Sequence, residues 1–239
     1  MSDETNTRCF MPTFENGGYW EYYKDLERQF DDFLEIVPYL SGNERTYSFR
    51  LANQILAIGA HIDSAFKEIA KYPEFSAKFP EIVNPKTKEG KPRYPNITDY
   101  YPFSEFYKLH QKTVMFKRLP QPEPLIPFKQ YLKVGERIAT PDWWQVYNKV
   151  KHEFSDNFVK ATLQNTRDAL AGAFLLNVIH TPAYIRLIEY RVVTPQATGT
   201  GSAIFTLKDG WKEKIDDLTK KDKRFGFIET PLFKYNYKE

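Results

Sequence analysis

The chain has a single cysteine, Cys9, among its 239 residues. One thiol cannot form an internal disulfide, and a CxxC metal site is equally excluded. Cysteine usage of this kind favours a reducing compartment, so we expect a cytoplasmic location. The first residues are polar and acidic and contain no apolar stretch, and we therefore expect no secretory signal.

Long hydrophobic runs are also missing. The most apolar run is Ala169–Leu176, which is far shorter than the about 20 apolar residues that a membrane-spanning helix needs. We therefore expect no membrane partner.

Charge of one sign is not in clear excess. Lys and Arg total 34 against 31 Asp and Glu, which gives a net charge of +3. The most charged stretch, Lys208–Arg224, mixes seven basic with five acidic residues. Such a mixture is typical of a solvated face, because only concentrated positive charge releases many counterions from nucleic acid.

Several motifs that carry chemistry do not occur. The sequence has no GxxxxGK[ST] loop, no GxGxxG turn, no HExxH pair and no GxSxG elbow. The four histidines lie on different predicted elements, whereas a zinc site needs about four convergent ligands. We predict neither a metal site nor a cofactor.

What the chain does have is helical periodicity and many aromatic residues. Apolar residues recur at a spacing of three or four residues over 19–37 and 44–71, which predicts a helix in each range. Further helices are predicted over 142–154, from 155 or 156 to 179, and after Pro182 to Glu189. Thr140 and Pro141 are the predicted N-cap and first residue of the helix over 142–154. Facing apolar stripes predict one core, made of Leu51, Ile55, Ile58, Ile62, Leu163, Leu170 and Phe174.

Ten of the 16 prolines lie between Pro73 and Pro127, where long regular elements cannot persist. We expect a short helix near 98–110 and an edge hairpin from 113–118 and 125–132. Short strands are predicted at 203–207, 225–228 and 233–237. The predicted fold is mainly α: a helical bundle with a long proline-rich insertion and a small β-rich C-terminal appendage. The predicted parts are a flexible arm (1–18), a helical bundle domain (19–190, with the insertion at 73–135) and a β-rich tail (191–239).

One polar cluster is the candidate site. Asn148 and His152 are separated by four residues on a predicted helix, so their side chains are neighbours, and Lys151 lies near Trp144 on the same helix. An imidazole can transfer protons near neutral pH and a lysine can hold a phosphate. The simpler interpretation is that His152 and Asn148 make structural hydrogen bonds while the lysine is solvated.

A second polar set lies on one face of the predicted helix over 44–71. Arg50 and His61 are its candidate binding residues, together with Trp144 from the first cluster. If the two helices pack antiparallel, Arg50 or His61 could face His152. Arg167 and Asn177, inside the most apolar helix, are candidates for satisfied buried polar contacts.

Three segments together resemble the HEPN superfamily of prokaryotic helical domains. They are the helix RTYSFRLANQILAIGAHIDSAFKEIAK, the segment WWQVYNKVKH and the helix NTRDALAGAFLLNVI. The WW–YN–KH motif in the second segment also resembles uncharacterised prokaryotic proteins of that kind. The resemblance implies a four- or five-helix bundle that dimerises, and, in active members, a metal-independent endoribonuclease. His152 matches the family's histidine and Asn148 its polar neighbour, but Gln145, Val146 and Tyr147 occupy the positions of its arginine.

Two functions follow as hypotheses. In the first, the chain is a non-catalytic HEPN-like interaction module in prokaryotic defence or stress response, with a homodimer and RNA, a nucleotide or a protein as candidate partners. In the second, it is a metal-independent endoribonuclease that uses His152, Asn148 and Lys151 at a dimer seam. The missing arginine favours the first. A ligand-binding role for the aromatic-rich insertion is a third alternative.

Overall fold

The computed structural model describes residues 17–119, 123–180, 193–195, 226–229 and 232–236. The predicted helix after Pro182 and the predicted strand at 203–207 therefore lie outside the described residues. The predicted N-terminal arm also lies outside them, except for residues 17 and 18. Within the described residues the protein is mostly helical with small antiparallel sheets, which confirms the predicted helical class.

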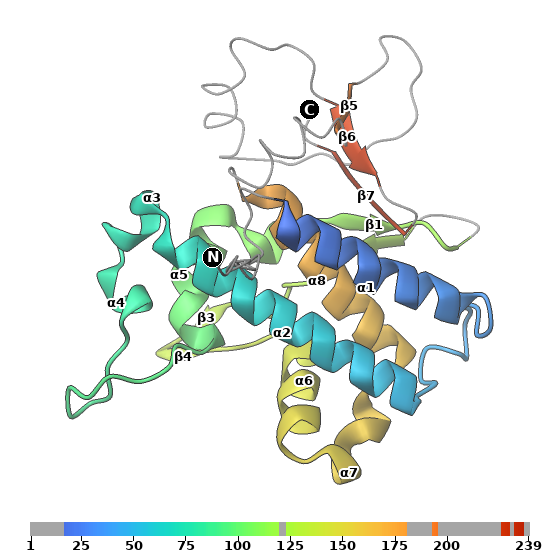
Figure 1. Cartoon of the computed structure of the whole chain (residues 1–239), viewed down its shortest axis with the longest axis horizontal. Helices are drawn as coiled ribbons and strands as arrows, with labels where there is room; N and C mark the ends of the chain where they lie inside the picture. Colours follow the sequence, from blue (N-terminus) through green and yellow to red (C-terminus); the bar gives the residue numbers. More distant parts are fainter. Residues whose placement is uncertain (1–16, 120–122, 181–192, 196–225, 230–231, 237–239) are drawn as a thin grey trace, which may run out of the picture.

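Four long helices form the centre of the molecule (Figure 1): α1 (Gly18–Leu34), α2 (Phe49–Lys71), α6 (Asp142–His152) and α8 (Leu163–Ile179). Helix α2 begins later than predicted, because the Ser48 hydroxyl caps it by accepting a hydrogen bond of 3.1 Å from the Leu51 amide. Thr140 is not the cap of α6, since Pro141 takes that position and no side chain caps the helix.

The continuous helix predicted up to Ile179 is wrong, because the chain breaks before α8. It forms α7 (Phe154–Asn157) and the 3₁₀ turn η3 (Phe158–Lys160), and Ala161 leaves the helical region. The Leu163 amide then donates to the Thr46 carbonyl at 2.8 Å, and the Thr162 hydroxyl caps α8. A long-range contact thus overrides the local helical pattern.

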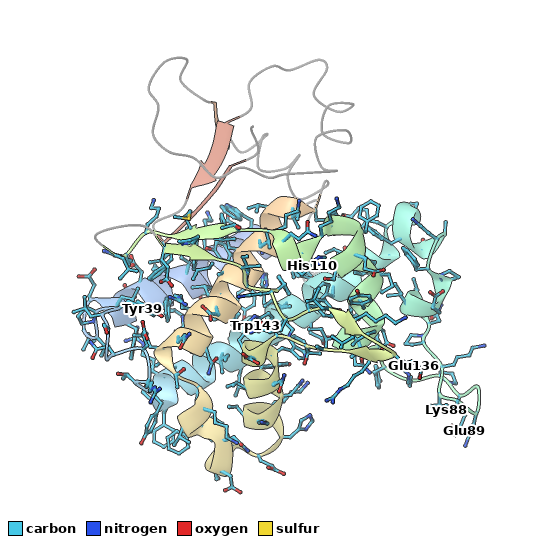
Figure 2. All side chains as sticks on the ribbon, turned by 180° about the vertical axis from the view of Figure 1, so that it is seen from behind. Tyr39, Lys88, Glu89, His110, Glu136 and Trp143 are labelled. Carbon is cyan, nitrogen blue, oxygen red and sulfur yellow. The ribbon has the colours of Figure 1, made fainter. Side chains whose placement is uncertain are left out.

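The proline-rich segment contains only short helical elements and strands. The helical elements are α3 (Pro73–Ser76), α4 (Pro80–Val83), η1 (Ile97–Tyr100), α5 (Tyr101–Tyr107) and η2 (Leu109–Gln111). Large side chains from this segment are fully buried, among them Tyr100, Phe103, Phe128 and Tyr131. The segment therefore builds part of the core, although charged residues such as Lys88 and Glu89 project from its edge (Figure 2).

Strands from both halves of the chain share one sheet. Its order is β2 (Glu123–Leu125), β1 (Val114–Phe116), β7 (Phe233–Asn236), β6 (Gly226–Glu229) and β5 (Val193–Pro195), all antiparallel. A hairpin forms as predicted, but the strand predicted at 125–132 is wrong, because β2 ends at Leu125. The predicted edge position is also wrong for β1, which lies inside the sheet because β7 pairs with it. A separate hairpin joins β3 (Lys133–Val134) to β4 (Arg137–Ile138).

Helix α2 packs against α1, α6 and α8, and the predicted core residues of α2 and α8 are all inaccessible to solvent. The predicted core residues are confirmed, but only α2 has an apolar stripe, because α8 is buried on nearly all sides. Among the residues that the structure describes, none of the helices has the length and apolar content needed to cross a bilayer.

Gly59 sets the distance between α2 and α6, because a Cβ placed there would collide with the Tyr147 ring. In an ordinary exposed helix, Gly→Ala stabilises by about 1 kcal/mol. Here we expect the opposite sign for Gly59→Ala, a loss of about 1–2 kcal/mol in the free energy of unfolding, since overpacking outweighs propensity. Urea denaturation measures this. A stabilised Gly59→Ala variant would show that α6 moves away freely.

Candidate functional site

The residues of the predicted catalytic cluster lie near the end of α6. Lys151 and His152 are exposed and Asn148 is partly buried. The ammonium of Lys151 lies 5.4 Å from the centre of the Tyr147 ring. Within the described part of the chain, no hydrogen bond joins any two of the three side chains.

The predicted binding residues do not gather around His152. Arg50 is exposed, donates to the Gln29 carbonyl at 3.2 Å and lies 5.8 Å from the Phe33 ring centre, so its guanidinium is directed toward α1. Trp144 is buried and its ring packs 4.9 Å from that of Tyr147. Trp144 is therefore a core residue.

His61 belongs to a polar contact inside the core. Asn177 donates from Nδ2 to His61 Nε2 at 3.0 Å and to the Ala173 carbonyl at 2.9 Å. The rings of Tyr19 and Tyr22 lie 5.4 and 5.3 Å from the imidazole. Burial lowers the pKa of His61 to about 3, so its imidazole is uncharged at neutral pH. The expectation that Asn177 makes a buried polar contact is confirmed.

An exposed cluster of aromatic rings lies beside the end of α6. This aromatic platform consists of Tyr47, Phe49, Phe154 and Phe158. The three phenylalanine rings are nearly parallel: Phe49 and Phe158 are 4.6 Å apart at 18°, and Phe49 and Phe154 are 6.2 Å apart at 9°. Tyr47 meets Phe158 edge-on at 5.9 Å. Phe49 is 62% exposed and Tyr47 52%, whereas Phe154 and Phe158 are partly buried and pack against the core.

Unpaired cations lie close to the platform in the chain. Arg45 precedes Tyr47 by two residues, Lys149 and Lys151 are in the last turn of α6, and Lys160 ends η3. Across the ranges that the structure describes, none of the four is in an ion pair. Lys160 donates a hydrogen bond of 2.6 Å to Asn157 Oδ1, and its charge, like those of the other three, is not neutralised by a described carboxylate. Glu44, Glu153 and Asp156 also lie in these segments.

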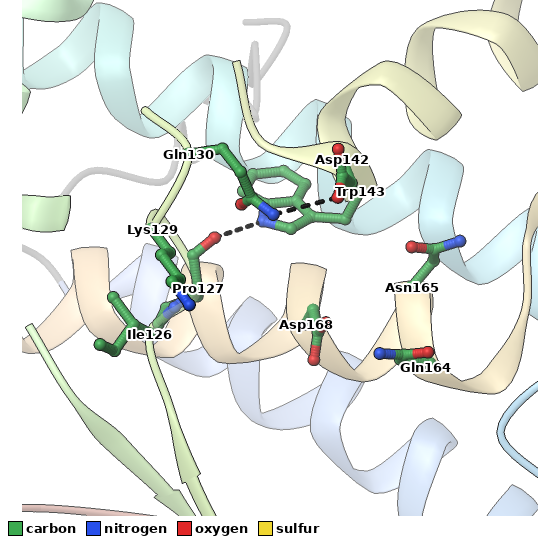
Figure 3. Close-up of a pocket in the computed structure, with 9 residues that line it drawn as sticks. All are labelled: Ile126, Pro127, Lys129, Gln130, Asp142, Trp143, Gln164, Asn165 and Asp168. Atoms are coloured by element: carbon green, nitrogen blue, oxygen red, sulfur yellow. Dashed lines mark hydrogen bonds between the residues drawn. The ribbon is translucent and has the colours of Figure 1, made fainter. Parts of the chain in front are cut away.

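A second candidate site is a polar pocket of about 290 Å³ between the start of α6, the first turns of α8 and the segment 126–130 (Figure 3). Its polar lining is Lys129, Gln130, Asp142, Gln164, Asn165 and Asp168, and its apolar lining is Ile126, Pro127 and Trp143. The segment 126–130 is fixed to α6 twice. Trp143 donates from Nε1 to the Pro127 carbonyl at 2.7 Å, and Gln130 donates to Asp142 at 3.0 Å.

Arg167 supports one wall of this pocket. Its guanidinium is buried, lies 4.6 Å from the Tyr39 ring centre and contacts two carboxylates, Asp168 at 2.8 Å and Glu123 at 2.9 Å. The burial of Asp168 raises the pKa of its carboxyl group. Arg167 lowers this pKa, and the negative charges of Glu123 and Asp142 raise it. The predicted buried polar contact of Arg167 is confirmed.

No metal centre is found in the part of the chain that the structure describes, because no three His, Cys, Asp or Glu side chains converge there. Comparison with protein-family models, curated proteins and solved structures finds no match. The HEPN resemblance therefore stays a prediction.

Sequence reasoning missed both the aromatic platform and the pocket. Phe49 lies next to the charged Arg50, and its stacking partners Phe154 and Phe158 follow more than one hundred residues later. A segment rich in aromatics and cations, such as 147–160, is the only local signal for the platform. The pocket has none, since its lining comes from three separated segments.

Proposed function

We propose that this protein is a non-catalytic, HEPN-like binding module whose partner is single-stranded RNA, held on the aromatic platform. The helical-bundle interpretation of α1, α2, α6 and α8 belongs to the same proposal. The observation that carries it is the near-parallel arrangement of the Phe49, Phe154 and Phe158 rings, of which Phe49 is mostly exposed.

Open aromatic faces support a role in base stacking. Burying Phe49 would remove apolar surface from water, and every nucleobase offers a flat π face of similar size. Base–aromatic stacking contributes about 1–3 kcal/mol per base and needs no particular sequence. In duplex RNA the bases are already stacked on one another, so the platform should prefer single strands.

The surrounding charges support a short contact with the phosphate backbone. Arg45, Lys149, Lys151 and Lys160 are available, whereas the carboxylates in the same segments limit the net positive charge. We therefore expect few phosphate contacts and a shallow salt dependence, because each neutralised phosphate of a single strand contributes a slope of about −0.7 in log K against log salt. Stacking rather than charge should supply most of the affinity.

The exposed cluster has two rival explanations. Exposed apolar patches also mark protein interfaces, and a homodimer was predicted from the sequence. The aromatic composition of the platform and the cations near it in the chain favour nucleic acid over a second copy of the chain. The nuclease alternative requires His152 to act on bound RNA, and its exposed position next to the platform is compatible with access to a backbone.

Phe49→Ala should weaken binding of a fluorescently labelled oligouridine by about tenfold or more, since one stacking contact is lost. Fluorescence anisotropy at low salt measures the dissociation constant. Phe49 is mostly exposed, so the fold should tolerate the change. Tyr94→Ala is the matched control, because Tyr94 is 91% exposed and lies away from the platform; its binding should equal that of the wild type.

Two further readouts separate the alternatives. The same RNA should remain intact with or without EDTA, and cleavage that disappears in His152→Ala would replace the binding module with the nuclease. Light scattering tests the homodimer. A dimer that Phe49→Ala dissociates, with no RNA binding by the wild type, would assign the platform to self-association and overturn the RNA proposal.

A further inference from the structure

The polar pocket between α6, α8 and segment 126–130 is independent of the aromatic platform in its chemistry. Two carboxylates, one ammonium and three side-chain amides line it, so its formal charges sum to −1, while each amide offers both a donor and an acceptor. Figure 3 shows Asp142 on the α6 side of the pocket and Asp168 on the α8 side. A ligand placed between them would meet carboxylate oxygens from two directions.

The charges in and behind the wall do not balance. Arg167 is shared by Asp168 and Glu123, so one buried guanidinium serves two carboxylates. Asp142 accepts only the neutral amide of Gln130. Lys129 is exposed at the rim. With Glu123 and Arg167 behind the wall included, three carboxylates are matched by two cations, which leaves one excess negative charge.

Ligand size and chemistry follow from these facts. A volume of about 290 Å³ is at the lower end of ligand pockets in proteins. The apolar wall of Ile126, Pro127 and Trp143 suits a short hydrocarbon chain, and the carboxylates suit a donor-rich cationic group. Phosphates and other anions are disfavoured by the same carboxylates. Among the described residues, no three side chains of His, Cys, Asp or Glu converge here to hold a metal ion.

We propose that this pocket binds a small primary alkylammonium ion, with the ammonium group between Asp142 and Asp168 and the alkyl chain against Trp143. The carboxylates accept the N–H donors, and the bound charge offsets their mutual repulsion. Because the raised pKa of the Asp168 carboxyl reflects burial and this repulsion, binding should release protons from it in the acid range. The affinity for the ammonium ion should therefore increase as the pH rises through that range. The other charged groups around the site are Arg167, Glu123, Asp142 and Lys129.

Protein NMR tests the proposal with two probes of equal shape, n-butylammonium and 1-butanol. The indole N–H of Trp143, hydrogen-bonded to the Pro127 carbonyl, is the reporter in the pocket wall, and Trp143→Phe assigns its resonance. Butylammonium should shift this resonance with saturation at millimolar concentration, and butanol should bind at least about tenfold more weakly, because it lacks the charge-assisted hydrogen bonds.

Two variants locate the ammonium group. Asp168→Asn and Asp142→Asn should each weaken butylammonium binding by about tenfold, since each loses one charged acceptor. Asp142 is exposed, so Asp142→Asn remains informative if Asp168→Asn fails to fold. Asp156→Asn, on the exposed part of α7, is the matched control and should bind like the wild type. Equal shifts with butanol, absence of saturation, or unchanged affinity in Asp142→Asn would overturn the proposal. RNA binding by the platform does not enter this test.

Discussion

Lowering the pH from about 7 to about 4.5 should remove about 5 kcal/mol from the free energy of unfolding through two buried histidines. Burial lowers the pKa of both His61 and His180 to about 3, whereas an imidazole in an unfolded chain has a pKa of about 6.5. Between these values the unfolded chain binds a proton that the folded protein does not bind. Stability is therefore independent of these groups above about pH 6.5 and falls as the pH decreases toward 3.

The surroundings of His61 explain why the folded protein resists protonation. The imidazole is 2% exposed, its Nε2 accepts from Asn177, and no described residue partners its Nδ1. A charged imidazolium would lose the Asn177 hydrogen bond, and no carboxylate of the described residues contacts it to compensate. His180 is fully buried at the end of α8, where its Nδ1 lies 2.9 Å from the Tyr107 hydroxyl.

Urea denaturation at several pH values measures the effect, and the comparison of variants isolates it. His61→Gln retains an acceptor for Asn177 but cannot bind a proton, so its loss between neutral pH and about pH 4.5 should be about half that of the wild type. The exposed His152→Gln is the control and should retain the full pH dependence. Carboxylates such as Asp168 contribute equally to the pH dependence of the free energy of unfolding in all three proteins. Equal pH dependence in His61→Gln and the wild type would contradict the assignment.

The helical fold was predictable where one face of a helix is apolar over several turns. The stripe of α2 was found correctly because local periodicity and burial agree there, whereas α8 is apolar and buried on nearly all sides. The break before α8 was not predictable, because it depends on backbone hydrogen bonds to Thr46 and Glu44 from more than one hundred residues away in the chain. The same holds for β1, whose interior position depends on pairing with β7.

The candidate site was harder to predict than the fold for a related reason. The spacing of Asn148 and His152 describes neighbours on one helix, and it contains no information on what faces them. The structure directs Arg50 toward α1 and His61 into the contact with Asn177. The platform instead joins Phe49 to rings from α7 and η3. A site assembled from separated segments leaves no spacing in the sequence that could identify it.

Ile58→Ala should destabilise the protein by about 2–5 kcal/mol, because the change removes buried methyl and methylene groups and leaves a cavity. Ile58 is fully buried on α2, the helix that contacts α1, α6 and α8, so a shift of one partner cannot fill the space without disturbing the others. Gly59 follows it directly and holds the Tyr147 ring close to the backbone, which restricts local collapse further. We therefore expect a value in the upper half of the range.

The same substitution at an exposed site supplies the control. Ile36 is 72% exposed just after α1, and Ile36→Ala should change the free energy of unfolding by no more than about 0.5 kcal/mol. Urea midpoints with an unchanged denaturant slope measure both variants, since the slope reports the surface exposed on unfolding. A loss for Ile58→Ala as small as that for Ile36→Ala would mean that the contact region of α2 relaxes around the missing atoms. The close approach of α2 and α6 at Gly59 would then not be rigid, and the expected destabilisation by Gly59→Ala should disappear with it.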